Sequence, residues 1–304
     1  MSDVLDELIG LLQLEPIGMN RFRGHCQDLG FRSLFGGQVL GQALSAAMQT
    51  LPVRSSESDD GCEWWPNSLH AYFLRPGTVT DSIEFEVTVT RDGRSFANRQ
   101  VIVSQRGKAI MSMICSFHQQ EDGLDHQSAM PDVAGPEGIA SQVELARQWR
   151  DGFPERVRHI YTADKPVEMR VIDPVNIFSP LVREPVKHVW LRSDDTLENS
   201  GNDAVRHHAT LLAYASDYNL ITTALYPHGV SVWQKDVQLA SLDHSIWFHR
   251  PFRLDDWLLY AIDSPTASGG RGFARGQIFN QDGVLVASVA QEGLIRHQPG
   301  SPAS

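Results

Sequence analysis

Apolar and polar residues alternate along four segments in the first 120 residues, after one run that is apolar on nearly every side. The alternation predicts antiparallel strands, with tight turns at Gly93 and Gly107, over residues 68–74, 83–91, 95–105 and 109–118. Ahead of them we expect an amphipathic helix at 1–12, a short strand at 20–26, a buried helix at 35–48 that begins with Phe35-Gly36-Gly37-Gln38, and a polar loop at 53–67. A buried helix followed by an antiparallel meander is typical of an α+β layer.

The same succession of elements is predicted again in the second half of the chain. Residues 120–164 contain Pro, Gly and acidic residues around one helical stretch near 143–149, which indicates a linker. Beyond the linker, two strands, a second helix and four further strands are expected at 167–172, 189–192, 204–225, 238–248, 257–264, 271–280 and 284–295.

Short motifs repeat between the two halves at a nearly constant separation of about 175 residues, which indicates two copies of one module. Phe73-Leu74-Arg75-Pro76 returns as Phe248-His249-Arg250-Pro251, and residues 94–100 are echoed by residues 271–277. A long buried helix wrapped by an antiparallel sheet is the hotdog arrangement, and two in tandem can join their sheets edge to edge. We therefore predict an α+β double hotdog; two independent α+β domains are the alternative that the constant offset disfavours. The expected boundaries are an N-terminal module at 1–119, a linker at 120–164 and a C-terminal module at 165–304.

The composition indicates which classes of protein this chain can belong to and in which compartment it is expected. A hydrophobic content of 41% supports well-filled cores, and a net charge of −11 argues against broad nucleic-acid binding, which normally needs a basic face. The three cysteines, Cys26, Cys62 and Cys115, are widely spaced and form no Cys-x-x-Cys pair, so a reducing cytoplasm is expected. The N-terminus does not resemble a signal peptide, no stretch reaches the length of a membrane span, and the last residues, 301–304, do not form a peroxisomal signal.

Common catalytic signatures are absent from the sequence. It contains no Gly-x-Ser-x-Gly elbow, no Walker lysine loop and no His-Glu-x-x-His, which disfavours α/β serine hydrolases, P-loop enzymes and zinc hydrolases. The adjacent His207 and His208 would point about 100° apart on a helix, so we interpret them as structural residues and expect no metal site.

Differences between the two copies locate the candidate chemistry. At the repeat offset, Gln42 of the buried helix 35–48 corresponds to Asp217, a carboxylate among apolar neighbours that requires partners or a function. Ser241 and Gln291 lie on the neighbouring predicted strands, and Cys115 occupies the position of Gln291 in the first copy. An acid, a hydroxyl and an amide can together hold and polarise one water.

A serine-histidine-aspartate triad built from Ser241, His244 and Asp243 is disfavoured. In a regular strand Ser241 and Asp243 share a face, whereas His244 points to the other, so His244 is predicted to be structural.

Several long blocks resemble the acyl-CoA thioesterase II (TesB) family over about residues 15 to 296. They are residues 35–43, 70–77, 216–219, 243–252 and 281–288, which include Ser216-Asp217-Tyr218-Asn219 and Asp243-His244-Ser245. The resemblance implies the double hotdog fold and hydrolysis of acyl-CoA by an activated water, with no cofactor. It places the catalytic aspartate, hydroxyl and glutamine of the family on Asp217, Ser241 and Gln291. It also implies association of copies through their sheets, as a homodimer or homotetramer.

Three further residues are candidates for binding substrate, and each has a structural alternative. His70, at the start of a strand in the first copy, could line a substrate tunnel or pack in the sheet, and Arg271 and Arg275 could bind the phosphates of coenzyme A or remain solvated on a hairpin. Two other functions stay open: a non-catalytic acyl-CoA-binding module, and a hotdog enoyl-CoA hydratase. The hydratase needs an Asp and a His acting on one water, and in the predicted second helix His207 and His208 precede Asp217 instead.

Overall fold

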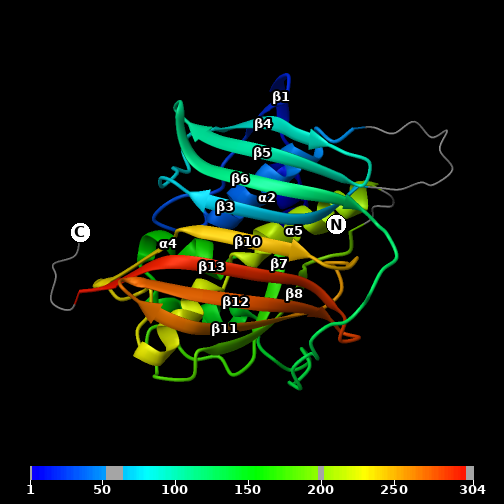
Figure 1. Ribbon diagram of the computed structural model, residues 1–304. Coiled ribbons are helices and arrows are strands. Elements are labelled where there is room, and N and C mark those ends of the chain that lie inside the picture. Colours follow the sequence, from blue (N-terminus) through cyan, green and yellow to red (C-terminus); the bar gives the residue numbers. More distant parts are fainter. Residues whose placement is uncertain (1, 53–63, 198–201, 299–304) are drawn as a thin grey trace.

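A single curved sheet forms the body of the protein. The computed structural model describes residues 2–52, 64–197 and 202–298, so Cys62, most of the predicted polar loop and the last residues, 301–304, lie outside the described residues. Within these ranges thirteen strands join in the order β1-β2-β4-β5-β6-β3-β10-β13-β12-β11-β8-β7, and β9 pairs with β13 (Figure 1). The strands are β1 (Glu15–Gly18), β2 (Arg21–Gly24), β3 (Trp64–Phe73), β4 (Ile83–Asp92), β5 (Phe96–Gln105), β6 (Lys108–Gln119), β7 (Val167–Val171), β8 (Val186–Ser193), β9 (Val237–Ser241), β10 (Asp243–Phe248), β11 (Leu258–Ser268), β12 (Arg271–Asn280) and β13 (Leu285–His297).

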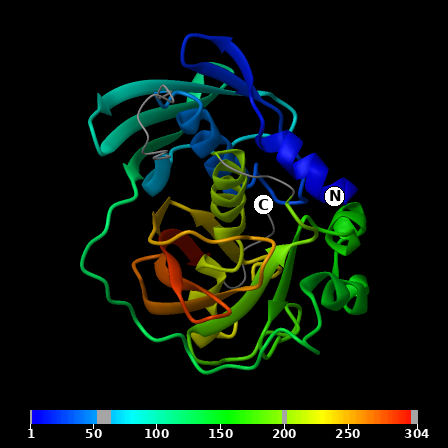
Figure 2. The ribbon, with the colours of Figure 1, turned by 90° about the vertical axis from the view of Figure 1, so that its right-hand side faces the viewer.

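Two long helices lie in the curve of this sheet, one for each half of the chain (Figure 2). The helix α2 is buried on nearly all sides, as its apolar run predicts. Both helices belong to one apolar core that they share with both halves of the sheet. The helices are α1 (Asp3–Leu12), α2 (Gly36–Met48), α3 (Gln142–Gln148), α4 (Glu155–Thr162) and α5 (Asn202–Ser216), with 3-10 turns η1 (Arg150–Gly152) and η2 (Ile221–His228). Among the described helices, none is long and apolar enough to cross a bilayer.

The two halves meet edge to edge at β3 and β10, which confirms the double hotdog. In this antiparallel pair His70 lies opposite Ser245, and these two residues are 175 positions apart in the chain. His70 and Ser245 are therefore equivalent residues of the two copies that face each other across a local two-fold axis. The junction removes one sheet edge from each copy, as the repeat predicts.

Helices α2 and α5 pack antiparallel because glycines of α2 allow their backbones to approach closely. A Cβ atom on Gly37 would lie 2.3 Å from the carbonyl oxygen of Tyr214, and one on Gly41 would lie 2.9 Å from that of Thr210. Any larger side chain at either position would push the helices apart. The start of α2 therefore lies against the end of α5.

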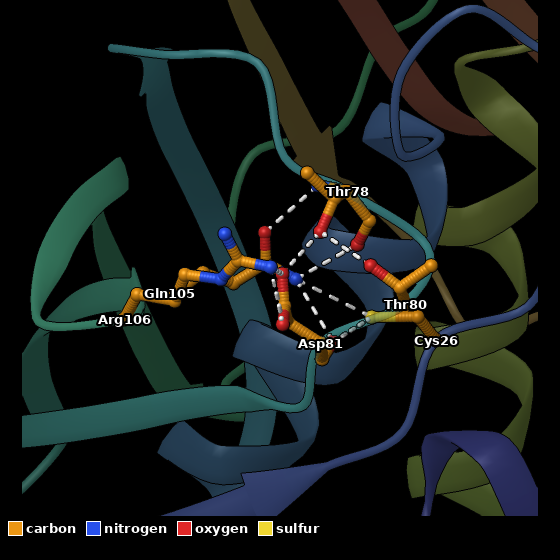
Figure 3. A network of polar contacts seen from close by, with 6 residues as sticks. All are labelled: Cys26, Thr78, Thr80, Asp81, Gln105 and Arg106. Carbon is orange, nitrogen blue, oxygen red and sulfur yellow. Dashed lines mark hydrogen bonds and ion pairs between the residues drawn. The ribbon is translucent and has the colours of Figure 1, made fainter.

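A polar network fixes the chain segment that leads into α2 (Figure 3). The amide of Gln105 donates from Nε2 to the carbonyl oxygens of Thr78 and Asp81, and its Oε1 accepts from the backbone N–H of Thr78. The thiol of Cys26 donates to the same Asp81 carbonyl at 2.9 Å. These bonds join the segment before α2 to the loop between β3 and β4 and so fix where α2 begins.

The predicted second helix, 204–225, is wrong as one continuous element. Helix α5 ends at Ser216, and the chain turns at Asn219, whose φ of 67° is left-handed, before the 3-10 turn η2 begins. A left-handed residue is a common helix terminator, and asparagine tolerates it. The apolar pattern continues into η2, so periodicity alone did not reveal the break.

The predicted strand 238–248 is also interrupted. β9 ends at Ser241 and β10 begins at Asp243. On the partner strand β13, Ser241 lies opposite Gly293 while Ser245 lies opposite Ala290, so β9–β10 contains one extra residue relative to β13. This is a β-bulge, which shifts the alternation of side chains by one residue beyond it.

Candidate active site

Three elements distant in sequence bring the predicted residues Asp217, Ser241 and Gln291 together. Asp217 directly follows the last residue of α5, Ser241 ends β9, and Gln291 lies in β13, which pairs with β9. The Gln291 amide donates from Nε2 to Asp217 Oδ1 at 2.7 Å. The same nitrogen donates to Ser241 Oγ at 3.1 Å. The acid, the hydroxyl and the amide therefore form one hydrogen-bonded group.

The Asp217 carboxylate is buried and is bound by the other half of the chain. Its side chain is 6% exposed, and Oδ2 accepts a 2.9 Å hydrogen bond from the backbone N–H of Gly37 in the first turn of α2. Phe35, which precedes α2, provides no side-chain cap, so Asp217 takes that role. Burial raises the pKa of Asp217, and the hydrogen bonds from Gln291 and Gly37 act against that rise.

The correspondence of Gln42 with Asp217 is not structural. Gln42 lies in the middle of α2, whereas Asp217 lies beyond the end of α5. The fully buried Gln42 amide donates to the carbonyl oxygens of Leu11 and His25, at 2.8 and 3.0 Å. The repeat offset applies to the strands that form the junction, but the helices and their connections differ in length, so the offset fails there.

The correspondence of Cys115 with Gln291 does follow from strand register. Cys115 comes directly after the residue opposite His70, and Gln291 directly after the residue opposite Ser245. Beside Cys115 the first copy carries the fully buried Arg99, which donates to Thr50 and forms an ion pair with Asp92 at 2.7 Å. By strand pairing, Arg99 lies opposite Cys115 as Ala274 lies opposite Gln291, so the first copy holds a buried guanidinium beside the position that corresponds to Gln291.

His244 belongs to the site, contrary to its predicted orientation. It is fully buried, its Nδ1 lies 3.2 Å from Gln291 Nε2 and 3.7 Å from Asp217 Oδ1, and its Nε2 lies 2.9 Å from Ser216 Oγ. The bulge between β9 and β10 turns it to the same side as Ser241. Strand alternation gave the wrong face because it assumed an unbroken strand; no local sequence signal marked the bulge.

Lys187 is a buried residue near the site that the sequence did not single out. From β8 its Nζ lies 3.0 Å from Thr222 Oγ1 and 3.3 Å from the carbonyl oxygen of Asn219, two residues after Asp217. Burial, and to a smaller extent the neighbouring Arg183, lower the pKa of Lys187 from 10.5 to about 7. Lys187 thereby supports the turn that ends α5 and carries Asp217.

Aromatic side chains form one wall beside Asp217. The rings of Phe35 and Tyr218 have centroids 4.3 Å apart, and the Tyr218 hydroxyl lies 3.1 Å from that of Tyr214. Phe31 stacks on Phe35 with centroids 5.3 Å apart. This wall reduces the contact of the carboxylate with bulk solvent and strengthens electrostatic interactions around it.

The three predicted substrate-binding residues lie outside this group. His70 is exposed on the sheet, with Nδ1 3.1 Å from Ser245 Oγ. Arg271 and Arg275 are exposed on β12 and are paired at 2.9 Å with Glu292 and at 2.8 Å with Asp263. They alternate with the buried residues of β12 that face the core, so their guanidinium groups are on the outer face of the sheet.

Within the described ranges, no cluster of His, Cys, Asp and Glu has the size of a metal site. His208, one of the two adjacent histidines, is buried and accepts a hydrogen bond at Nδ1 from the backbone N–H of Leu254 at 3.0 Å. Burial lowers its pKa to about 4. It therefore supports the fold as a neutral side chain.

Both halves of the chain match known protein families. Residues 26–118 match the family described as acyl-CoA thioesterase N-terminal domain, and residues 157–294 match the family described as acyl-CoA thioesterase. Acyl-CoA thioesterase 2 of Haemophilus influenzae is 42% identical over 97% of this chain and 99% of that protein. Acyl-coenzyme A thioesterase 8 of Homo sapiens is 38% identical over 95% of this chain and 88% of that protein.

Solved structures show the same architecture. An acyl-CoA thioesterase II, TesB2, from Mycobacterium marinum superposes with a TM-score of 0.74 at 36% identity, covering 97% of this chain and 99% of that one. A protein with a hot dog fold from Alicyclobacillus acidocaldarius has a TM-score of 0.73 at 18% identity over 98% of this chain and all of that one, and supports the fold alone. The chain therefore belongs to the acyl-CoA thioesterase family of thioester hydrolases, built as a double hotdog.

Proposed function

We propose that this acyl-CoA thioesterase cleaves its substrate by direct attack of one water, with Asp217 as the general base. The observation that carries the proposal is the hydrogen-bonded group of Asp217, Ser241 and Gln291, in which a buried carboxylate with a raised pKa is oriented from both sides. A base whose pKa lies closer to the working pH accepts a proton more effectively.

The proposed reaction forms a carbon–oxygen bond and breaks a carbon–sulfur bond without an acyl-enzyme. The water oxygen attacks the thioester carbonyl carbon while its proton passes to Asp217. The tetrahedral intermediate then collapses, the electron pair of the carbon–sulfur bond leaves with sulfur, and coenzyme A departs as a thiolate. The proton held by Asp217 is released to this thiolate or to solvent, which gives a carboxylic acid and coenzyme A and restores the carboxylate.

Gln291 and Ser241 orient the water in this proposal. Gln291 uses its Nε2 for Asp217, so its Oε1, which is buried with no partner among the described residues, is free to accept from the water. Ser241 Oγ accepts from Gln291, so its hydroxyl hydrogen remains to donate to the water or the thioester. We also expect amides at the start of α2 to bind the developing oxyanion; the Gly37 N–H there donates to Asp217.

Release of free thiol from a panel of acyl-CoAs tests the proposal. We expect Asp217→Asn to lower kcat by about 10²- to 10⁴-fold, the usual worth of a general base, and Gln291→Ala to lower it by about 10- to 100-fold. Asp164→Asn makes the same chemical change on an exposed loop and should retain wild-type rates. Full activity of the Asp217→Asn protein would refute this mechanism.

The same proteins separate the alternative functions. A binding module would bind acyl-CoA in the wild type but release no thiol, and a hydratase would convert enoyl-CoA to the hydroxyacyl product. Alanine variants of His70, Arg271 and Arg275 test the proposed substrate contacts. If Arg271 and Arg275 bind the phosphates of coenzyme A, their replacement raises KM with kcat unchanged.

We further propose that the chain divides into modules at 1–119 and 165–304 with a linker at 120–164, and that copies associate through their sheets as a homodimer or homotetramer. The outer face of the central strands supports association, since Tyr72, Ile114 and Trp247 are exposed there. Light scattering should give a dimer or tetramer mass, and Trp247→Glu should lower it. A cytoplasmic location is proposed from the described cysteines, Cys26 and Cys115, which are both free thiols.

A further inference from the structure

His244 connects the end of α5 to the amide of Gln291. It is fully buried in β10, with Ser216 Oγ 2.9 Å from one ring nitrogen, Nε2, and Gln291 Nε2 at 3.2 Å from the other, Nδ1. The mechanism proposed above gives this histidine no part, and its ring has no exposed surface from which to reach a water.

The hydrogen bonds of Ser216 determine which ring nitrogen carries the proton. The Ser216 hydroxyl donates its only hydrogen to the carbonyl oxygen of Ala213 at 3.0 Å. Ser216 Oγ must therefore accept from His244, which places the proton on Nε2 and leaves a lone pair on Nδ1. Burial also lowers the pKa of His244 to about 3, so the ring is neutral at physiological pH.

A lone pair on His244 Nδ1 constrains the amide of Gln291. Of the three atoms around Gln291 Nε2, Asp217 Oδ1 and His244 Nδ1 can only accept, and Ser241 Oγ can accept as well, so the amide nitrogen must face them. If the amide were rotated by half a turn, its Oε1 would face a carboxylate oxygen and the histidine lone pair. The observed orientation leaves Oε1 buried with no partner among the described residues.

We propose that His244 is a positioning residue that locks the Gln291 amide with its oxygen directed to the attacking water. The chain of contacts runs from Ala213 through Ser216 and His244 to Gln291, so the end of α5 orients both Asp217 and the amide that binds it. This inference rests on the proposed function of Asp217 and Gln291. It assigns His244 an effect on kcat through Gln291, with no contact to substrate.

Two substitutions at His244 test the roles of its two ring nitrogens separately. In His244→Asn the side-chain oxygen can take the place of Nδ1 as the acceptor for Gln291, whereas in His244→Gln the amide reaches the place of Nε2 and leaves Gln291 without that acceptor. We expect His244→Gln to lower kcat by about 10- to 100-fold with KM unchanged, and His244→Asn to recover most of the loss. Thermal unfolding of each variant shows whether it is folded.

A double-mutant cycle gives a readout that a purely structural role would not produce. In a Gln291→Ala background the amide is absent, so His244→Gln should change kcat by less than about 3-fold. If the effects of the two substitutions multiply, or if His244→Gln is folded and fully active, the positioning role is overturned while the function of Asp217 stands. An active Asp217→Asn protein would instead overturn the proposed function.

Discussion

The buried Lys187 should make the stability of this protein depend on pH in the alkaline range. Replacing it by methionine keeps an unbranched chain of similar length but removes the ammonium group. Burial lowers the pKa of Lys187 from 10.5 to about 7, so between these two pH values the unfolded chain binds more protons than the folded protein. The contribution of Lys187 to stability therefore rises as the pH increases from 7 to 10.5, and it is lost as the pH falls through 7.

The size of the effect follows from the same two values. At about 1.4 kcal/mol for each tenfold change in the proton equilibrium, the difference between 10.5 and about 7 corresponds to about 5 kcal/mol. Hydrogen bonds from Nζ to Thr222 and to the carbonyl oxygen of Asn219 favour the charged form, so this is an upper limit. We expect the wild type to gain about 2 to 4 kcal/mol over the Lys187→Met variant between pH 6.5 and pH 10, because this window covers about three of the pH units over which the difference develops.

Urea unfolding followed by tryptophan fluorescence measures this difference at a series of pH values. The comparison between wild type and variant removes the contribution of all other titrating groups. Lys235→Met, at an exposed position, removes one positive charge without changing the contacts of Lys187. If the wild-type and Lys187→Met curves remain parallel from pH 6.5 to 10, Lys187 carries its charge in the folded protein and the reasoning from burial is wrong.

Three other predictions concern activity and stability. Burial raises the pKa of Asp217 above about 3.9, the value for an exposed aspartate. As the pH is lowered, kcat/KM should therefore begin to fall at a pH above that value; a fall that begins only below it would contradict the role of burial. Gly37→Ala places a Cβ atom 2.3 Å from the Tyr214 carbonyl oxygen, and should cost about 1–3 kcal/mol of stability and most of the activity; unchanged unfolding and thiol release would show that the helices can separate. Arg99→Met removes a buried guanidinium and its ion pair with Asp92, and should lower stability by about 1–3 kcal/mol while thiol release per folded molecule is unchanged; a matching loss of rate would place Arg99 in the catalytic mechanism.

Local patterns were sufficient for most of the elements and for the duplication. The turn at Arg106-Gly107 is a clear case, because both residues have positive φ, 49° and 71°, and the hairpin joins Gln105 to Lys108 as the sequence predicts. Alternation with a period of two residues, and glycine where the backbone must be left-handed, depend only on neighbouring residues. The strand repeats follow from the same local information in two copies, and they predicted that the sheets join edge to edge; the structure shows that the junction lies at His70 and Ser245.

Tertiary structure decided how the candidate site is assembled. The sequence selected Asp217, but not the amide of Gly37, 180 residues away, that binds its carboxylate. It placed His244 on the wrong face, because a bulge defined by pairing with β13 shifts the alternation. The bulge, the close approach of two helices and the burial of Lys187 all arise from contacts between distant segments, and such contacts leave no periodic trace in the chain. The sequence by itself therefore determined the scaffold and the candidate acid, and only the fold decided what orients that acid.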